Sequence, residues 1–255
     1  SGIPFYRLIT GLEAHFDEKK EELVEILQTL LKMIFRPENL MVDFVGEEKA
    51  VGLLDAPVEA FKAALYTGSV EMAHYIPEVS RKNEGFLTSG QVNYVCRAGN
   101  FRKSGLKYTG ALRVLKVMLG YEYLWVNVRV KGGAYGCMCS FGRSGDSYFV
   151  SYRDPNLGKT IDVYEKAADA IAEFTADERT MTQYIIGAVS DLDVPMNPAA
   201  KGLYSLSAYM TGLDDAALQR ERDELLSATV EDIRALSAHI RAFMQEDLLC
   251  VVGTA

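Results

Sequence analysis

The sequence is short of the residues from which most metal and nucleophile centres are built. Its 255 residues include three histidines, and none has a partner at the spacing of an HExxH or HxxEH zinc motif. It also contains no GxSxG nucleophile elbow and no phosphate-binding P-loop. We therefore expect no metal-ligand set within these residues, and we expect His15, His74 and His239 to be structural or exposed side chains.

Cysteine is scarce as well, with four residues and no CxxC pair. Cys96, Cys137, Cys139 and Cys250 all lie in apolar, strand-like segments, which is typical of reduced thiols in a core. We expect a reducing compartment, with one disulfide as the alternative. No cationic and apolar leader opens the sequence, which indicates a cytoplasmic protein. The start at Ser1, without Met, indicates a processed product or a piece of a longer chain.

Long apolar runs and an excess of basic charge are also missing. The longest apolar stretch is far shorter than the roughly 20 residues of a membrane helix, so no membrane partner is expected. The formal charge is -8, from 27 basic and 35 acidic residues. A nucleic-acid partner is not expected either, because it would require a basic face. The 49% hydrophobic content is that of a globular protein with a sizeable core.

The first part of the chain reads as a helix followed by a strand. Apolar residues recur at helical spacing over 17–35, with Asp17 as the expected N-cap. Pro37 ends this helix, and 40–46 has the composition of a short buried strand that stops at a glycine.

The last part of the chain repeats this order. A capping box at Thr229 and Asp232 begins a helix with apolar residues to Phe243, and a strand follows before Gly253. This similarity predicts tandem copies of one domain, and the alternative is two unrelated helix–strand endings. On the first interpretation residues 1–50 are the tail of a preceding repeat, 51–84 form a connector with a short helix, and 85–255 form one complete repeat.

The predicted repeat combines strands with helices. Strands are expected at 92–96, 134–141 and 147–153, with a hairpin loop at 142–146. Thr175 and Glu178 are the expected capping box of one helix. Helices are expected over five segments: 108–119, 161–171, 178–188, 201–210 and 214–226. This order predicts an α+β fold, with an antiparallel-rich mixed sheet and helices packed on one of its faces.

The segment Val128–Gly136 contains the most unusual group of residues. Arg129 and Tyr135 are a guanidinium and a phenol, two hydrogen-bond donors separated by a glycine pair that permits positive φ and close approach of another chain. The pair is suited to holding an oxyanion whose chemistry lies elsewhere. The preceding residues, 124–130, fit a strand by alternation, but the glycine pair favours a helix that ends there. The alternatives for this segment are a simple helix C-cap or bulge with a surface arginine, and an anion-binding glycine loop.

Val128–Gly136, with Ser151–Asn156 and the helices that follow, resembles the presequence-protease branch of the insulinase/pitrilysin-type zinc peptidases. The resemblance covers 85–255, and 1–50 is similar to the end of the preceding repeat. It implies four homologous α/β units in two halves that close around a peptide chamber. It also implies that zinc, the cofactor of the whole enzyme, is bound by an inverted HxxEH motif in an N-terminal half that is absent from this sequence.

The resemblance further implies roles for the residues of the glycine loop. Arg129 and Tyr135 would stabilise the scissile carbonyl and the oxyanion, as catalytic residues. Gly132, Gly133 and Ala134 would lie against the backbone of the peptide substrate. The protein expected is thus the C-terminal part of a peptide-degrading zinc peptidase, inactive without its N-terminal catalytic half. The alternative is a non-catalytic structural or binding subunit of the same fold, but the presence of both donors favours the enzyme.

Overall fold

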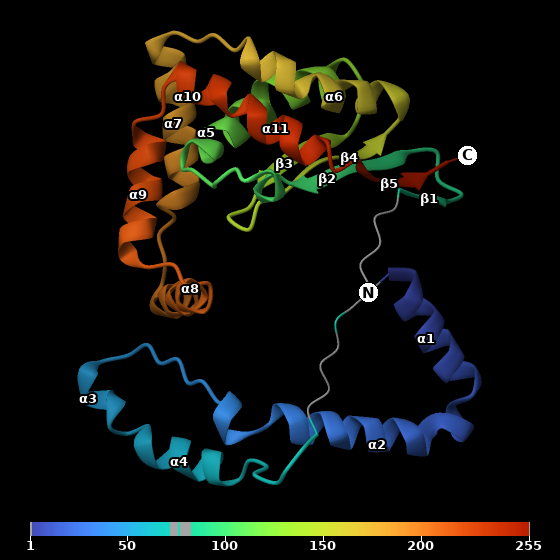
Figure 1. The fold of residues 1–255 in the computed structure, drawn as a ribbon, viewed down its shortest axis with the longest axis vertical. Helices are drawn as coiled ribbons and strands as arrows, with labels where there is room; N and C mark the ends of the chain where they lie inside the picture. Colours follow the sequence, from blue (N-terminus) through green and yellow to red (C-terminus); the bar gives the residue numbers. More distant parts are fainter. Residues whose placement is uncertain (1, 72–75, 77–82, 255) are drawn as a thin grey trace. The chain divides into compact units, whose positions relative to one another are not determined.

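The computed structural model describes residues 2–71, 76 and 83–254, so His74 lies outside the described residues. The chain forms two compact units. Unit 1 comprises residues 1–78 and 196–207, and unit 2 comprises residues 79–195 and 208–255 (Figure 1). The predicted boundaries between repeat tail, connector and complete repeat stay a prediction. No helix of the described residues is long and apolar enough to cross a bilayer.

Unit 1 consists of helices and irregular segments. Its helices are α1 (Gly2–Ala14), α2 (Phe16–Ile34), α3 (Glu48–Val51), α4 (Asp55–Ala63) and most of α8 (Pro198–Met210), with a 3₁₀ turn at Pro37–Asn39. Helix α2 confirms the helix predicted at 17–35, because its apolar stripe has helical period. The predicted N-cap is wrong. His15 occupies that position, and Asp17 lies in the first turn, where a carboxylate favours the helix dipole.

The strand predicted at 40–46 is not formed. Strands need a hydrogen-bonded neighbour, and this extended segment pairs with no strand in the described part of the chain. It packs instead on α8, where a Cβ at Gly202 would lie 2.3 Å from Val45 Cγ2. Helices α1 and α2 contain no buried residue, and apolar side chains such as Phe5, Leu27 and Leu31 are about half exposed. Unit 1 therefore displays apolar surface that its own described residues do not cover.

Unit 2 is built on a five-stranded sheet. The strands are β1 (Glu84–Leu87), β2 (Asn93–Asn100), β3 (Gly136–Phe141), β4 (Asp146–Asp154) and β5 (Leu248–Gly253). Their order is β1-β5-β2-β4-β3, with β1 and β5 parallel and all other pairs antiparallel. This confirms the predicted antiparallel-rich mixed sheet. Strand β1 was not predicted from the sequence, because four residues give too short a pattern.

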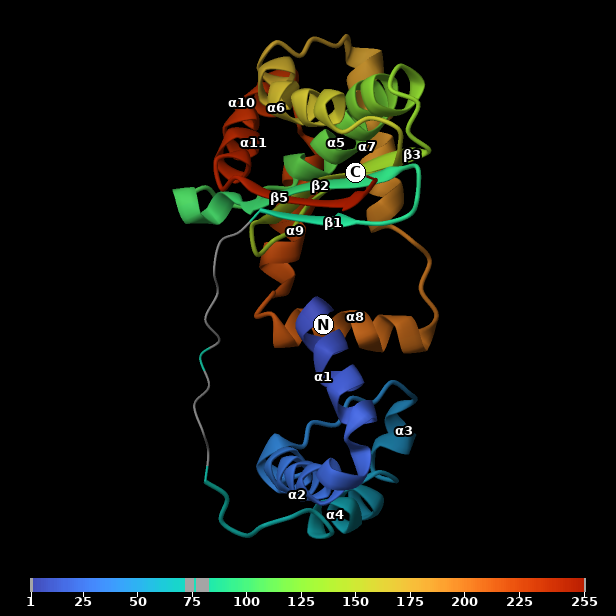
Figure 2. The ribbon, with the colours of Figure 1, turned by 90° about the vertical axis from the view of Figure 1, so that its right-hand side faces the viewer.

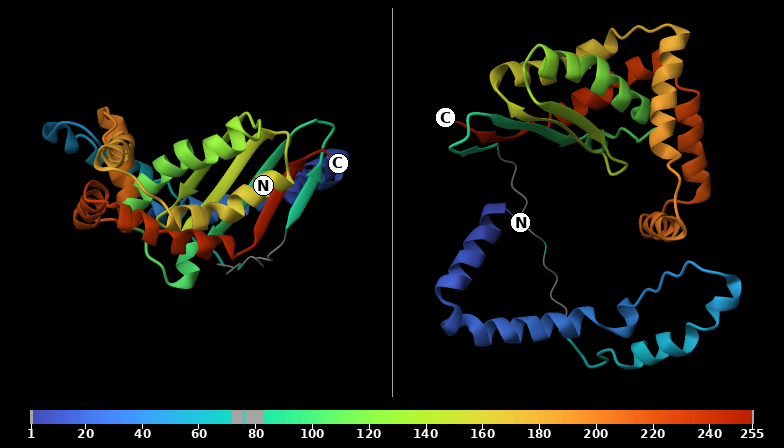
Figure 3. Two further views of the ribbon diagram at one scale, coloured as in Figure 1. Left: turned by 90° about the horizontal axis from the view of Figure 1, so that it is seen from above. Right: turned by 180° about the vertical axis from the view of Figure 1, so that it is seen from behind.

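Helices cover one face of this sheet (Figures 1 and 2). The covering elements are α5 (Ala111–Met118), η3 (Leu119–Val130), α6 (Gly158–Ala172), α10 (Val230–Ala235) and α11 (Ser237–Met244). Viewed from above, α6 and α11 run across the strands (Figure 3). Helices α7 (Glu178–Leu192) and α9 (Asp215–Leu226) pack against α5 and each other. A single helical layer on one side confirms the predicted α+β fold.

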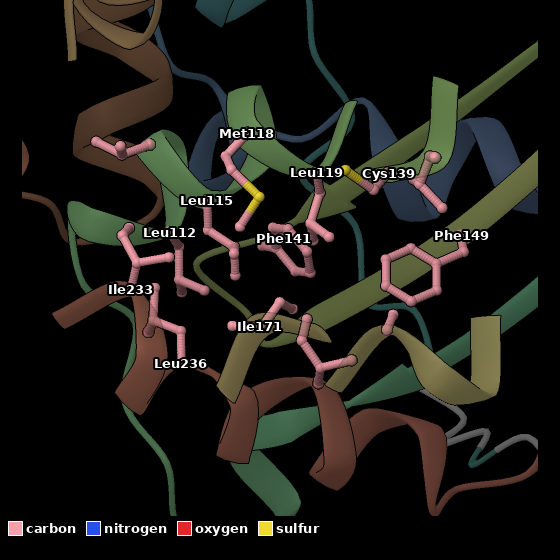
Figure 4. Packing of buried hydrophobic residues seen from close by; sticks show 14 of the residues in the cluster. Leu112, Leu115, Met118, Leu119, Cys139, Phe141, Phe149, Ile171, Ile233 and Leu236 are labelled. Atoms are coloured by element: carbon pink, nitrogen blue, oxygen red, sulfur yellow. The ribbon is translucent and has the colours of Figure 1, made fainter. Parts of the chain in front are cut away.

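The core lies between the helices and the covered face of the sheet (Figure 4). Phe149 of β4 is fully buried, and its ring centroid lies 5.1 Å from that of Phe243 and 5.4 Å from that of Tyr164. Leu112 and Leu115 of α5 fill the same core, as their helical spacing predicts. Strand β2 turns Asn93, Val95 and Arg97 inward and leaves Tyr94 exposed, so one of its two faces is buried.

One of the two predicted capping boxes is present, and the other is not. At α10, Thr229 accepts from the Asp232 N–H and Asp232 accepts from the Thr229 N–H, which confirms the prediction. At α7 the predicted box of Thr175 and Glu178 is wrong. Asp177 is the N-cap instead, and its carboxylate accepts from the Thr180 N–H at 2.8 Å. Asp is among the strongest N-cap residues, and at this position it holds the orphan N–H of the first turn.

All four cysteines are free, but they differ in exposure. Cys139 is buried, Cys96 and Cys137 are half-buried, and Cys250 is exposed, so the core location predicted for Cys250 is wrong. Burial raises the pKa of Cys137 to about 11 and that of Cys139 to about 12. Both thiols are therefore almost fully protonated near neutral pH, and the thiolate is the reactive form.

Iodoacetamide at pH 8 is accordingly expected to alkylate Cys250 first and Cys139 last. The Cys139 pKa of about 12 lies about four units above the pH, so only about one Cys139 in ten thousand is a thiolate, and this side chain is also shielded from the reagent. Peptide mass spectrometry over a time course measures the order. In urea all four cysteines are expected to react together. Equal rates in the folded chain would contradict the burial of Cys139.

Candidate functional site

The glycine loop follows a π-helix. Element η3 (Leu119–Val130) is helical throughout, and the Lys131 N–H donates to the Val126 carbonyl at 3.0 Å, five residues back. The helix predicted at 124–130 is therefore confirmed over the strand. Gly133 has φ +81° and its N–H donates to the Arg129 carbonyl at 2.8 Å, a left-handed helix end. The C-cap alternative thus describes the backbone correctly, and this cap places Arg129 in the last turn.

The local backbone explains why both positions of the pair, Gly132 and Gly133, are glycine. A Cβ at Gly132 would lie 2.4 Å from the Val128 carbonyl oxygen, and the φ of Gly133 disfavours any other residue. Ala134 is 3% exposed, and its N–H donates to the Val128 carbonyl at 3.2 Å. Its methyl group is out of reach of a substrate, so only backbone of this loop is available to a peptide. Contact between the loop and a peptide stays a prediction.

The Arg129 guanidinium lies over the ring of an aromatic neighbour. Its central carbon is 3.8 Å from the ring centroid of Trp125, one turn earlier in η3, and 5.9 Å from that of Tyr135. Within the described part of the chain, no carboxylate forms a salt bridge with it. Stacking on an aromatic face holds a guanidinium while leaving its N–H groups available. Sequence reasoning missed Trp125, although a Trp four residues before Arg129 on a helix is a readable signal.

Tyr135 precedes β3 and is 58% exposed. Its N–H donates to the Arg153 carbonyl at 3.2 Å, which fixes the backbone against the end of β4. The ring packs edge-on against Tyr152, with centroids 5.5 Å apart, and the Arg153 guanidinium lies 5.5 Å from its centroid. The structure therefore brings Arg129 and Tyr135 together on an exposed surface of unit 2, and adds Tyr152 and Arg153.

A buried carboxylate ties this surface to α6. Asp154 is fully buried, and it accepts from the Asn156 N–H at 2.9 Å and from the Thr160 hydroxyl at 2.7 Å. The Asn156 side-chain amide then donates to the Gly132 carbonyl. These hydrogen bonds join the end of β4, the start of α6 and the glycine loop, and they restrain the conformation of the loop.

The described residues do not fit a metal site. No group of three or more His, Cys, Asp or Glu side chains among them could hold an ion. The ring of His239 packs on Phe101, with Nε2 2.9 Å from the Lys107 carbonyl oxygen, and His15 lies 3.5 Å from Glu18 on the surface. Grooves of about 590 Å³ and 230 Å³ on unit 2 are lined by residues other than Arg129 and Tyr135.

Comparison with known sequences identifies relatives over the whole chain. Residues 83–254 match the family of the PreP C-terminal domain. The chain is 38% identical to protein HypA of Clostridium perfringens over 253 residues, 99% of this chain and 26% of that protein. It is 30% identical to presequence protease 1, chloroplastic/mitochondrial, of Arabidopsis thaliana over 256 residues, 24% of that protein. The chain thus spans about a quarter of the length of these relatives.

Solved structures show the same fold at low sequence identity. A protease from Helicobacter pylori has a TM-score of 0.57 at 14% identity, over 83% of this chain and 54% of that one. A peptidase M16 inactive domain from Pseudomonas fluorescens has a TM-score of 0.53 at 17% identity, over 80% and 51%. The resemblance stated from Val128–Gly136 is confirmed, and the chain belongs to the presequence protease family of M16 peptidases, with its C-terminal domain at residues 83–254.

Proposed function

We propose that this chain is the C-terminal part of a zinc metallopeptidase that degrades unstructured oligopeptides, and that Arg129 and Tyr135 hold the scissile carbonyl. The observation that carries the proposal is the pairing of two fixed donors on one exposed surface. The Arg129 guanidinium and the Tyr135 ring lie 5.9 Å apart, and neither side chain has a carboxylate partner among the described residues. Family membership supports a peptide as the substrate.

The chemistry of peptide cleavage suits these two groups. Attack on a peptide carbonyl moves negative charge onto its oxygen, and donors already in place stabilise that charge without reorganisation. A guanidinium N–H gives a charge-assisted hydrogen bond, and the phenol O–H gives a second, neutral one. Before a substrate arrives, the Trp125 ring already contacts the Arg129 guanidinium, and the Tyr152 ring packs edge-on against the Tyr135 ring.

The rest of the reaction centre would come from further polypeptide. The described residues supply no metal-ligand group, so the zinc of the proposed enzyme, which would supply Lewis-acid chemistry, is assigned to an N-terminal half. The uncovered apolar faces of α1 and α2 support such a partner, since exposed apolar surface of this extent usually marks an interface. The chain alone is expected to be inactive, and its cytoplasmic location stays a prediction.

Replacing Tyr135 with phenylalanine in the longer polypeptide tests the proposal. Loss of one oxyanion donor is expected to lower kcat about 100-fold while KM and zinc content are unchanged. Steady-state cleavage of a quenched fluorescent peptide gives kcat, and elemental analysis gives the zinc. Tyr121→Phe, an exposed tyrosine on η3, is the matched control and should leave kcat unchanged. Full activity of Tyr135→Phe would remove the catalytic role of Tyr135 and leave this part of the polypeptide a structural or binding one.

A further inference from the structure

Strand β4 carries a bulge where it reaches the site. Asn93 pairs with Asp154 and Val95 with Ser151, so Tyr152 and Arg153 both face the single residue Tyr94. Arg153 has φ +49°, in the left-handed region that residues other than glycine seldom occupy. Bulges next to functional sites re-aim a side chain that regular strand geometry would send elsewhere. This bulge therefore determines where the Arg153 side chain lies.

The bulge places a second guanidinium beside Tyr135. The central carbon of Arg153 is 5.5 Å from the Tyr135 ring centroid, close to the 5.9 Å of Arg129. Arg153 is exposed, and no carboxylate among the described residues forms a salt bridge with it. The adjacent carboxylate, Asp154, is buried and already accepts from Asn156 and Thr160. Uncompensated positive charge is thus concentrated at this surface of a chain whose net charge is -8.

We propose that Arg153 is a specificity-determining residue that binds a carboxylate of the peptide substrate close to the scissile bond. The planar guanidinium presents two parallel N–H groups that match the two oxygens of a carboxylate. The carboxylate comes either from an Asp or Glu side chain or from the free C-terminus of a short peptide. The inference rests on the proposed function, because the position of Arg153 next to Tyr135 is what puts it near the reacting carbonyl.

The experiment compares matched peptides in the longer polypeptide. One series exchanges Asp for Asn at each position flanking the cleaved bond, and a second exchanges a free C-terminal acid for an amide. The unmodified enzyme is expected to favour the carboxylate member about two- to fivefold in kcat/KM, the range of a partly exposed ion pair. The series that shows this preference identifies the source of the carboxylate. The preference is expected to shrink as salt is raised.

Arg153→Asn is the main variant, because asparagine tolerates positive φ and keeps the bulge. It is expected to abolish the preference while the neutral peptide is cleaved within about twofold of the original rate, since Arg129 and Tyr135 remain. Arg153→Lys keeps the positive charge but loses the planar guanidinium with its two parallel N–H groups, and it is expected to retain part of the preference. Arg179→Asn, an exposed arginine on α7, controls for the loss of one charge.

Each remaining outcome overturns the proposal. An unchanged preference in Arg153→Asn would remove Arg153 from substrate recognition. An equal loss with acidic and neutral peptides would show that Arg153 only positions Tyr135. If the unmodified enzyme prefers the carboxylate member in neither series, Arg153 does not bind a substrate carboxylate. Failure of the proposed function is seen separately, as full activity of Tyr135→Phe on neutral peptides.

Discussion

Replacing Arg129 with alanine is expected to lower kcat of the intact peptidase about 100- to 1,000-fold, the usual cost of losing one oxyanion donor. The guanidinium is the charged member of the donor pair, so its loss should exceed that of the Tyr135 hydroxyl. KM is expected to change little, because the interaction strengthens as charge develops on the carbonyl oxygen. Steady-state kinetics on a fluorescent peptide, with zinc content measured in parallel, gives the result.

Trp125 provides an internal check on this assignment. Trp125→Leu removes the ring that lies 3.8 Å from the guanidinium, and a cation–π contact of about 0.5–2 kcal/mol corresponds to a loss of about 2- to 30-fold in kcat/KM. Trp125→Phe keeps a ring and should recover part of the loss. In an Arg129→Ala background, Trp125→Leu should have no further effect, because nothing is left to position. Full turnover of Arg129→Ala would end the catalytic assignment of this residue.

Asp154→Ala is expected to lower the free energy of unfolding of unit 2 by about 2–4 kcal/mol, since one buried and one half-buried donor lose the acceptor that they share. The Asn156 N–H and the Thr160 hydroxyl, now at 2.9 Å and 2.7 Å from the carboxylate, would be left unpaired. The Asn156 amide would also lose its orientation toward the Gly132 carbonyl. Urea denaturation followed by the fluorescence of Trp125, the single tryptophan of the chain, measures the loss.

The control for this variant is Asp146→Ala. Asp146 begins β4 and bonds to Asn100 and Ser144, but these are exposed, so its loss should cost less than about 1 kcal/mol. Equal effects of the two variants would show that the buried network contributes no more than a surface one. Weaker catalysis in the intact Asp154→Ala enzyme would show that the same network keeps the glycine loop in its active conformation.

Long segments whose apolar residues recur at helical spacing were predictable from the sequence. The helical spacing of apolar residues over 108–119 predicted α5, and the glycine pair predicted the end of η3. Segments that depend on a distant neighbour were not. Residues 40–46 have strand composition, but within the described ranges no strand pairs with them. Strand β1 forms because β5, more than 160 residues later, lies alongside it. Strand formation is thus a property of the pair, which no local pattern contains.

Some residues of the candidate site were likewise predictable from the local sequence, and others were not. Arg129 and Tyr135 could be named because their side-chain chemistry and the glycines between them are local in sequence. Trp125 was within reach of the same reasoning. The place of Arg153 in the site was not predictable from the sequence. Its position depends on a bulge that forms when β4 pairs with β2, and an arginine in the sequence does not indicate a positive φ. The hydrogen bonds of Asp154 likewise depend on where α6 starts.

The place of β5 between β1 and β2 has a consequence during synthesis. Among the strands that the structure describes, β1 is synthesised first and β5 last, yet β1 pairs with β5 alone. As the nascent chain leaves the ribosome, β2, β3 and β4 can pair with one another. Strand β1 can join the sheet only after residues 248–253 have emerged and paired with both β1 and β2. Until then the edge of β2 that pairs with β5 is unpaired, and an unpaired strand edge can associate with other chains.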